Sequence, residues 1–220
     1  MTTPDERLPE ESDSADRPVL VLVHGFADSA ATWDPLVAAL GEDATVHRSD
    51  LPGHGSRAAD PDHLSRDEAV AEIAERLRAI GTPVHLVGHS LGGYLAMTLA
   101  IRHPELVGAL SLISSGPGFR DPGARADWNR YMDRIATKAG MPASAAGLGH
   151  QLDSLVMDHV REISAPVLQI LGSKDRRYSA GASYLQRVLP ESRMVTVEDA
   201  GHHPQSSHPT LVADALLGRL

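Results

Sequence analysis

Short runs of aliphatic and β-branched residues alternate with longer amphipathic stretches along most of this chain, and this pattern constrains the fold most strongly. Nearly continuous apolar runs are typical of strands covered on both faces, as in a parallel sheet. The alternation therefore predicts an α/β domain, with a mostly six-stranded parallel sheet and helices on both faces. The expected strands are Val19–Val23, Thr45–Arg48, Val84–Val87, Leu106–Ile113, Val167–Leu171 and Arg193–Val197.

The amphipathic stretches between these strands are expected to be helices. In the stretch 66–80, Val70, Ile73, Leu77 and Ile80 recur every three or four residues and form one apolar stripe. Such a stripe is typical of a surface helix packed against a sheet. The expected helices are Trp33–Leu40, Arg66–Ile80, Leu91–Arg102, Ala180–Val188 and Pro209–Leu217.

One interval is much longer than a single crossover requires, because 53 residues, 114–166, separate the fourth and fifth expected strands. Helices are expected there at Arg125–Ala139 and Ala145–Val160, around Gly140-Met141-Pro142. The simplest interpretation is a short helical lid, at about 117–163, over the carboxyl ends of the strands. An ordinary crossover with one additional helix is the alternative.

The 220 residues suit one domain, and the amino-terminal segment differs from the rest in composition. Residues 1–16 are rich in Pro, Ser, Asp and Glu, with six acidic residues against one basic residue. A segment with so little apolar surface is expected to be a disordered acidic leader. Residues 17–220 are then a single domain.

Composition also excludes several classes of function. The net charge of −9 argues against nucleic acid as a partner, and the absence of cysteine excludes disulfides, thiolate metal ligands and a cysteine nucleophile. No apolar run approaches the roughly 20 residues that span a bilayer. The amino terminus does not resemble a signal segment either, so we expect a cytoplasmic protein without membrane insertion.

The sequence Gly88-His89-Ser90-Leu91-Gly92 lies directly between an expected strand and an expected helix. This arrangement is typical of a nucleophile elbow, a turn so tight that the positions two before and two after the serine need to lack side chains. Gly88 and Gly92 occupy those two positions. The alternative is that both glycines only allow close helix packing.

Four further motifs follow strands in a consistent order. They are His24-Gly25-Phe26, Asp50-Leu51-Pro52-Gly53-His54-Gly55, Gly172-Ser173-Lys174-Asp175 and Asp199-Ala200-Gly201-His202. Together with the elbow, they make the chain resemble the α/β-hydrolase-fold enzymes from Val19 to Leu220, and in particular the compact, small-lid serine esterases of that superfamily.

This resemblance implies a catalytic triad of Ser90, Asp175 and His202, in the family's order. His202 would act as the base and Asp175 would orient it. The backbone N–H groups of Phe26 and Leu91 would form the oxyanion hole. His203 is the close alternative for the base, and Asp121, Asp153 and Asp199 are weaker alternatives for the acid.

Several other side chains are candidates for substrate binding. They are His24, His89, Trp128, Tyr131, Met132 and Leu152, with Phe26 and Leu148 as further apolar contacts. The alternative interpretation of the apolar residues is that they only pack the lid against the body of the domain. Of the two histidines, His24 is expected to brace the oxyanion loop, and His89 to pack beside the nucleophile. No cofactor is expected, and no metal, because His202, His203 and His208 lack a carboxylate at ligand spacing.

The activity implied by the resemblance is hydrolysis of a small-molecule carboxylic ester through an acyl-enzyme. Alternatives are hydrolysis of a thioester or a carbon–carbon bond, or a reaction like that of the menaquinone-pathway lyase, which carries an arginine where Tyr94 stands. A hydrolase-fold ligand sensor is the alternative outside enzymes.

Many relatives have an antiparallel hairpin before the strand that corresponds to Val19–Val23, and only the acidic leader precedes it here. The sheet edge left without that hairpin is expected to need a cover. The leader and a second subunit of a homodimer are the two alternatives, and the oligomeric state does not follow from the sequence.

Overall fold

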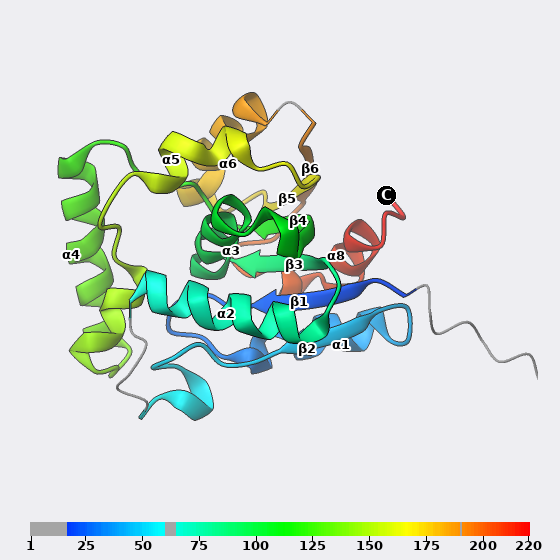
Figure 1. Ribbon diagram of the computed structural model, residues 1–220, viewed down its shortest axis with the longest axis horizontal. Coiled ribbons are helices and arrows are strands. Elements are labelled where there is room, and N and C mark those ends of the chain that lie inside the picture. Colours follow the sequence, from blue (N-terminus) through cyan, green and yellow to red (C-terminus); the bar gives the residue numbers. More distant parts are fainter. Residues whose placement is uncertain (1–16, 60–64, 190) are drawn as a thin grey trace, which may run out of the picture.

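The computed structural model describes residues 17–59, 65–189 and 191–220, so the expected leader at 1–16 lies outside the described residues. Its centre is one six-stranded, all-parallel sheet in the order β2-β1-β3-β4-β5-β6 (Figure 1). This sheet and its flanking helices confirm the predicted fold class. The strands are β1 (Val19–Val23), β2 (Thr45–Arg48), β3 (Val84–His89), β4 (Val107–Ile113), β5 (Val167–Gly172) and β6 (Arg193–Val197).

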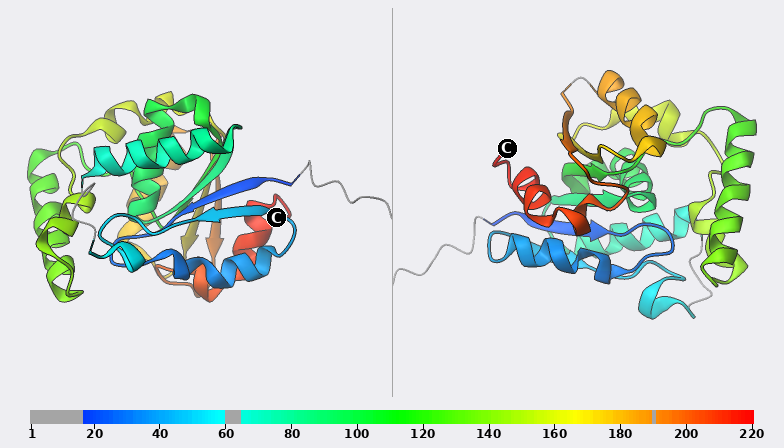
Figure 2. Two further views of the ribbon diagram at one scale, coloured as in Figure 1. Left: turned by 60° about the horizontal axis from the view of Figure 1, so that its bottom comes forward. Right: turned by 180° about the vertical axis from the view of Figure 1, so that it is seen from behind.

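Alternate residues of each strand point to opposite faces of the sheet, and each face has its own helices. On one face, Leu20 and Leu22 of β1 pack in a cluster with α1 (Asp34–Leu40) and α8 (Pro209–Leu216). On the other face, Val21 and Val23 pack with α2 (Arg66–Ile80), α3 (Leu91–Arg102) and α6 (Arg176–Val188). Figure 2 shows these two helical layers on either side of the strands.

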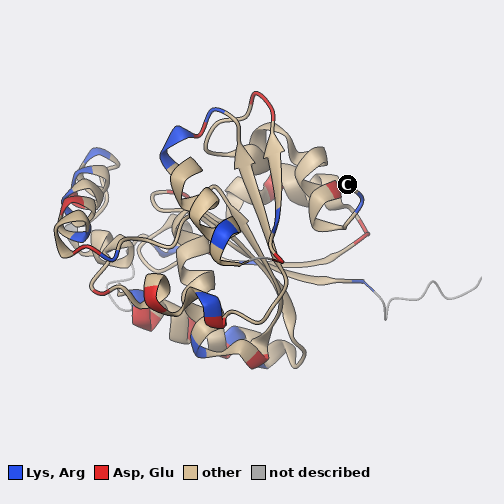
Figure 3. Ribbon diagram, turned by 90° about the horizontal axis from the view of Figure 1, so that it is seen from above, with Lys and Arg blue, Asp and Glu red and all other residues tan. Residues whose placement is uncertain are grey.

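Charged residues lie almost entirely on the helices and loops that surround the sheet (Figure 3). In the central strands β1, β3, β4 and β5, no described residue is Asp, Glu, Lys or Arg. Strands covered on both faces would have to desolvate such charges, and this explains why the sequence shows nearly continuous apolar runs there.

The helix boundaries follow local signals. Helix α2 begins where Ser65 and Glu68 form a capping box and ends at Gly81, which has a left-handed φ of 83°. Helices α2 and α3 have the predicted limits, whereas α6 begins four residues earlier than predicted, directly after Asp175. The remaining helices are α4 (Pro122–Lys138), α5 (Leu155–His159) and α7 (Pro204–Ser207), with 3₁₀ turns at Ala30–Trp33, Gly55–Arg57, Pro104–Leu106, Ala143–Gly149 and Val160–Glu162.

The prediction of a helix at Ala145–Val160 was wrong. This stretch consists of a 3₁₀ turn, an extended segment and the short α5. Two glycines, at 147 and 149, disfavour a continuous helix. Side chains of α4 also bond to its backbone: Trp128 Nε1 donates to the Gly149 carbonyl at 2.9 Å, and Asn129 Oδ1 accepts from the Gln151 N–H at 2.7 Å. These bonds hold the extended segment against α4.

The region expected to be a lid contains α4, α5 and two of the 3₁₀ turns. The strand arrows of the sheet point toward α4 (Figure 1). Helix α4 therefore stands beyond the carboxyl ends of the strands, which is the side where parallel sheets bind their ligands.

An ion pair joins this region to the body. The guanidinium of Arg66 is buried and donates to both carboxylate oxygens of Asp153, at 2.6 and 2.8 Å. These two hydrogen bonds lower the pKa of Asp153 to about 2, because they stabilise its ionised form despite partial burial. The pair ties the start of α2 to the segment that precedes α5.

We expect Asp153→Asn to lower the free energy of unfolding by about 2 kcal/mol, because the buried guanidinium of Arg66 loses the carboxylate that accepts two of its hydrogen bonds and keeps the more exposed Asp67, at 2.8 Å, as its anionic partner. The estimate lies below that for a fully buried pair, since the Asp153 side chain is 46% exposed. Urea denaturation would measure the change. Asp127→Asn is the matched control, because Asp127 pairs with Arg130 on the exposed face of α4 and its loss should cost little. Equal effects of the two substitutions would contradict this role for the Arg66–Asp153 pair.

In the part of the chain that the structure describes, no helix has both the length and the apolar character that crossing a bilayer requires. The cytoplasmic location stays a prediction from the sequence.

Candidate active site

Ser90 lies at the turn between β3 and α3. Its backbone has φ 51° and ψ −112°, a conformation that residues with a side chain rarely adopt. Two hydrogen bonds hold this turn: the Ser90 N–H donates to the Ile113 carbonyl at 2.9 Å, and Ser115 Oγ donates to the Ser90 carbonyl at 2.8 Å. Strained backbone that is held by its surroundings in this way is concentrated at functional sites. The hydroxyl of Ser90 faces a cavity.

The elbow requires glycines because neighbouring backbone segments lie too close to it to leave space for a Cβ atom. A Cβ atom at Gly88 would overlap the carbonyl of Gly92, and a Cβ atom at Gly92 would overlap the carbonyl of Val23. Because both obstacles are backbone atoms, no side-chain movement could relieve them. This geometry is the physical reason for the spacing of Gly88, Ser90 and Gly92.

Asp175 and His202 meet next to Ser90, from loops that follow β5 and β6. The Nδ1 atom of His202 lies 2.7 Å from Oδ2 of Asp175. Burial of the Asp175 carboxyl would raise its pKa, but the hydrogen bond and the charge interaction with His202 outweigh this effect and hold the pKa below its usual range. An ionised Asp175 accepts a hydrogen bond only from a protonated Nδ1, so His202 presents Nε2 as its available base.

Tyr178, which the sequence analysis missed, is the fourth side chain of this group. Its hydroxyl lies 3.1 Å from Ser90 Oγ, and its ring stacks on the ring of His202 with centroids 4.9 Å apart and an interplanar angle of 16°. Burial raises the pKa of the Tyr178 hydroxyl, which therefore stays protonated. The position of Tyr178 in the first turn of α6, three residues after Asp175, was the only available sequence signal.

The two groups expected to form an oxyanion hole belong to Phe26 and Leu91, and both residues line the cavity. In the described part of the chain, neither backbone N–H donates to a protein acceptor. Leu91 is also the first residue of α3, where the helix dipole favours negative charge. A developing oxyanion between these two N–H groups would find both donors available.

His24 holds the loop that carries Phe26. Its ring is fully buried, with Nδ1 2.8 Å from the Gly25 carbonyl and Nε2 accepting from the Leu51 N–H at 2.9 Å. Since a carbonyl oxygen only accepts, Nδ1 carries the proton. Burial lowers the pKa of His24 and keeps the ring neutral, as both hydrogen bonds require.

The alternative acids have other partners. Asp121 caps α4 by accepting from the Ala124 N–H at 2.7 Å, Asp153 pairs with Arg66, and Asp199 pairs with Lys174 at 2.9 Å. The alternative base, His203, points to Asp28, with its Nε2 atom 3.7 Å from Oδ2. Among these candidates, the structure brings only Asp175 and His202 together beside Ser90.

The cavity in front of Ser90 has a volume of about 730 Å³ and a largely apolar wall. One side of the wall is the apolar stripe of α4, formed by Trp128, Tyr131, Met132 and Ile135 at helical spacing. The guanidinium of Arg177 lies over the ring of Tyr131, 4.4 Å from its centroid, and it is the only Lys or Arg side chain among the described lining residues. Gln151 and the Gly116–Phe119 segment complete this wall.

Of the side chains expected to bind substrate, Trp128, Tyr131 and Met132 line this cavity, and His24, His89 and Leu152 do not. His24 and His89 are buried behind the loop and the elbow, whereas Leu152 points to solvent with 68% of its surface exposed. The reason for the exposure is local, because residue 152 belongs to the extended segment that replaced the predicted helix. Of the two further apolar contacts, Phe26 lines the cavity and Leu148 is buried in the core.

Comparisons with known proteins agree with this fold. A family model described as the alpha/beta hydrolase family matches residues 20–215. The pimeloyl-[acyl-carrier protein] methyl ester esterase of Nitrosomonas europaea is 32% identical over an alignment of 238 positions, and the match covers 87% of this chain and 91% of that protein. The putative 2-succinyl-6-hydroxy-2,4-cyclohexadiene-1-carboxylate synthase of Bacillus subtilis is 28% identical, and the match covers 87% of this chain and 86% of that protein.

Solved structures share the architecture at lower sequence identity. A thermophilic esterase from Thermogutta terrifontis superimposes with a TM-score of 0.79 at 23% identity, covering 92% of this chain and 89% of that one. A similarity at this level of identity establishes the fold and does not establish the reaction.

Proposed function

Because the chain belongs to the alpha/beta hydrolase family, we propose that it is a serine hydrolase that cleaves carboxylic esters with Ser90, His202 and Asp175. The observation that carries this proposal is the strained Ser90 at the mouth of an apolar cavity, next to a histidine that is hydrogen-bonded to an ionised carboxylate. A serine hydroxyl is a weak nucleophile at neutral pH and needs such a base.

In the first half of the reaction, Ser90 Oγ attacks the ester carbonyl and its proton passes to His202 Nε2. Before this step the hydroxyl turns from Tyr178 toward His202, because its hydrogen-bond partner in the substrate-free protein is the Tyr178 hydroxyl. The carbonyl oxygen becomes an oxyanion that accepts from the N–H groups of Phe26 and Leu91. His202 then returns the proton to the departing alcohol, which leaves an acyl group on Ser90.

In the second half, water attacks the acyl carbon while His202 Nε2 takes its proton. The same two N–H groups hold the oxyanion. When the bond between the acyl carbon and Oγ breaks, His202 protonates Oγ, so a carboxylic acid leaves and the hydroxyl of Ser90 is restored. Asp175 stays ionised throughout and stabilises the imidazolium that forms twice in each cycle.

The wall of the cavity favours an extended, uncharged acyl chain. The stripe of Trp128, Tyr131, Met132 and Ile135 offers apolar contact, and each methylene buried there contributes about 0.8 kcal/mol. The name of the Nitrosomonas europaea relative specifies a methyl ester of an acyl chain, and this is the substrate class we propose to test alongside general esters.

The second candidate function is the lyase reaction named for the Bacillus subtilis relative. One residue argues against the lyase reaction. Tyr94 lines the cavity here, at the position where the menaquinone-pathway lyase carries an arginine. A polyanionic substrate needs several cationic or donor groups, and Arg177 is the only permanent cation that the described lining supplies. The ester reaction requires none of these charges. A ligand sensor, the alternative outside enzymes, would give at most one acylation per molecule.

We expect steady turnover of p-nitrophenyl esters, with kcat/KM rising from acetate to medium acyl chains, by up to about fourfold for each buried methylene. The cavity of about 730 Å³ sets the length at which the rise stops. A series from acetate to palmitate, assayed together with the methyl esters of the same acids, measures both. Multiple turnover supports an enzyme, whereas a single stoichiometric burst would indicate a sensor. No turnover on any ester would contradict the proposed function.

A further inference from the structure

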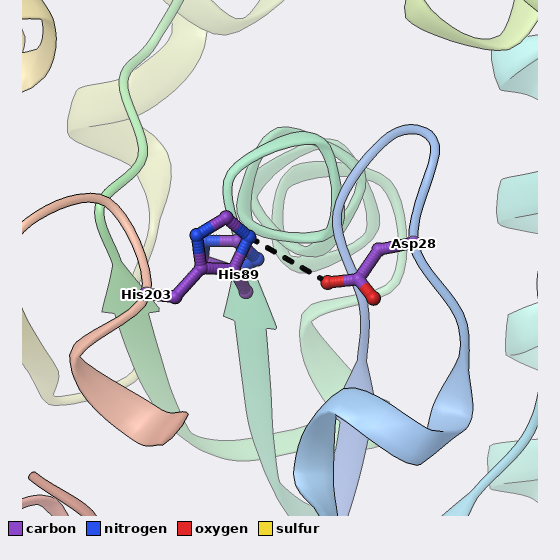
Figure 4. Close-up of side chains that lie close together, drawn as sticks. All are labelled: Asp28, His89 and His203. Carbon is purple, nitrogen blue, oxygen red and sulfur yellow. Dashed lines mark ion pairs between the residues drawn. The ribbon is translucent and has the colours of Figure 1, made fainter. Parts of the chain in front are cut away.

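Three side chains that the proposed reaction does not use converge between the loops that follow β1 and β6, at the end of β3 (Figure 4). They are Asp28, from the loop after β1, His89, at the end of β3, and His203, from the loop after β6. One nitrogen or oxygen of each lies within 4.8 Å of the corresponding atoms of the other two. The three residues come from two loops and the end of a strand, and 175 positions separate Asp28 from His203 in the sequence, so only the fold brings them together.

The hydrogen bonds of His89 fix which of its nitrogens carries the proton. Its Nε2 atom lies 2.8 Å from the backbone carbonyl of His202 and must donate, since a carbonyl only accepts. The ring is buried, with 1% of its surface exposed, and a neutral imidazole carries a single N–H. The Nδ1 atom therefore has a free lone pair, and in the described part of the chain this buried atom has no hydrogen-bond partner.

Asp28 presents a second acceptor to the same point. Its Oδ1 atom accepts from the Ser29 N–H at 2.8 Å, while Oδ2 is buried without a hydrogen-bond partner among the described residues. Two buried acceptors that face each other without a donor cost free energy, because both have lost water. A cation held between them would satisfy both groups at once.

We propose that Asp28 Oδ2, His89 Nδ1 and His203 Nε2 form a binding site for a divalent transition-metal ion of the zinc class. Two imidazole nitrogens and one carboxylate oxygen are ligands that Zn²⁺ prefers, whereas Mg²⁺ and Ca²⁺ prefer oxygen alone. A water molecule would complete the tetrahedron. The Nε2–H of His89, donated to a backbone carbonyl, is the outer contact that typically orients a metal-bound histidine.

The geometry allows the site to close around an ion with little movement of the core. Ligand bonds of about 2.0–2.2 Å place tetrahedral ligand atoms roughly 3.4 Å apart, so the present group needs to contract. His203 can make this movement, because its side chain is 50% exposed. Gly25 leaves space next to His89 Nδ1, because a Cβ atom at this position would lie only 2.8 Å from that nitrogen and would obstruct a ligand there.

The site is separate from the proposed triad. His202 has its Nδ1 atom hydrogen-bonded to Asp175, and its hydrogen bond with His89 uses its backbone carbonyl and neither of its ring nitrogens. Metal binding can therefore be measured in a protein whose esterase activity is absent. Failure of the ester assay would not affect this proposal, and failure of metal binding would not affect the proposed ester reaction.

Titration of the metal-free protein with Zn²⁺ in a calorimeter tests the site, and Co²⁺ provides a visible spectrum that reports tetrahedral coordination. We expect one equivalent of Zn²⁺ to bind with micromolar or tighter affinity and Mg²⁺ not to compete. The unfolding temperature should rise by about 5 °C or more when free Zn²⁺ is at 100 times Kd.

The variants Asp28→Asn and His203→Gln each remove one ligand and should weaken Zn²⁺ binding by at least about 100-fold. Asp28→Asn should fold well, because its amide can donate to the unpartnered His89 Nδ1. His208→Gln, in the next turn of the same segment, and His202→Gln are matched controls that should keep the wild-type affinity. If no Zn²⁺ binds, the space between Asp28 Oδ2, His89 Nδ1 and His203 Nε2 is filled by a bridging water and not by a metal ion. If binding is lost in His202→Gln alone, the metal ion binds at the triad. Either outcome overturns the proposal.

Discussion

Ser90→Ala is expected to lower kcat/KM on p-nitrophenyl esters by at least about 10⁴-fold and to leave the fold intact. The substitution removes the atom that forms the acyl bond. The N–H donors of Phe26 and Leu91 remain, and they would support only the small residual rate of water attack. Steady-state kinetics measures the loss, and circular dichroism with urea denaturation measures the fold.

The backbone of Ser90 supplies an internal check on this prediction. Its φ of 51° is strained for any residue with a side chain, so Ser90→Ala keeps the strain and Ser90→Gly releases it. Ser90→Gly should be as inactive as Ser90→Ala but more stable than the wild type, by about 1 kcal/mol. Stability and activity then change in opposite directions at one position, as expected where strain serves function.

Ser179→Ala is the matched serine control. Ser179 is exposed on α6, one residue beyond Tyr178, and its hydroxyl bonds only to the Arg176 carbonyl among the described residues. It should keep wild-type kcat/KM. Full activity of Ser90→Ala would contradict the proposed mechanism, and equal losses in Ser90→Ala and Ser179→Ala would indicate a general effect on the enzyme instead of the loss of a nucleophile.

Much of this fold follows from local sequence, because its strands and most helices are determined by short-range patterns. The limits of β1, β2, β6, α2 and α3 match the prediction residue for residue. In these elements, apolar periodicity, a capping box or a glycine marks each end within a few residues. The elbow follows for the same reason, since the overlap at Gly88 and Gly92 is a property of one turn.

The parts that could not be predicted depend on contacts between distant segments. Local periodicity favoured one helix at 145–160, but side chains of α4 bond to that backbone and hold part of it extended. The same limit applies to Tyr178, whose role depends on stacking against His202, 24 positions away in the sequence. It applies most clearly to Asp28. The segment with His202, His203 and His208 has no carboxylate at ligand spacing in the sequence, but the fold places the Asp28 carboxylate beside His203.

The three histidines around the elbow illustrate how position divides one side-chain type among several tasks. His89 and His202 have ring centroids 4.8 Å apart, and those of His89 and His203 are 4.7 Å apart. Only His202 has a carboxylate partner at 2.7 Å and a place in the wall of the cavity. The chemistry therefore depends on the partner of each ring, and adjacent histidines can be separated by substitution.

We expect His202→Ala to lower kcat/KM by at least about 10⁴-fold and His203→Ala to lower it by less than tenfold. His202 is hydrogen-bonded to Asp175 and lines the same cavity as Ser90, whereas the nearest carboxylate to His203 is that of Asp28, at 3.7 Å. Ester assays with a chelator present measure both variants without a contribution from bound metal. A larger loss in His203→Ala than in His202→Ala would reassign the base.

Combining the substitutions distinguishes a catalytic unit from two independent contacts. In the proposed mechanism Ser90 and His202 act on the same proton, so the double variant Ser90→Ala/His202→Ala should be no slower than either single variant. If the two losses instead multiplied, the residues would contribute separately, and His202 would not be the base that activates Ser90.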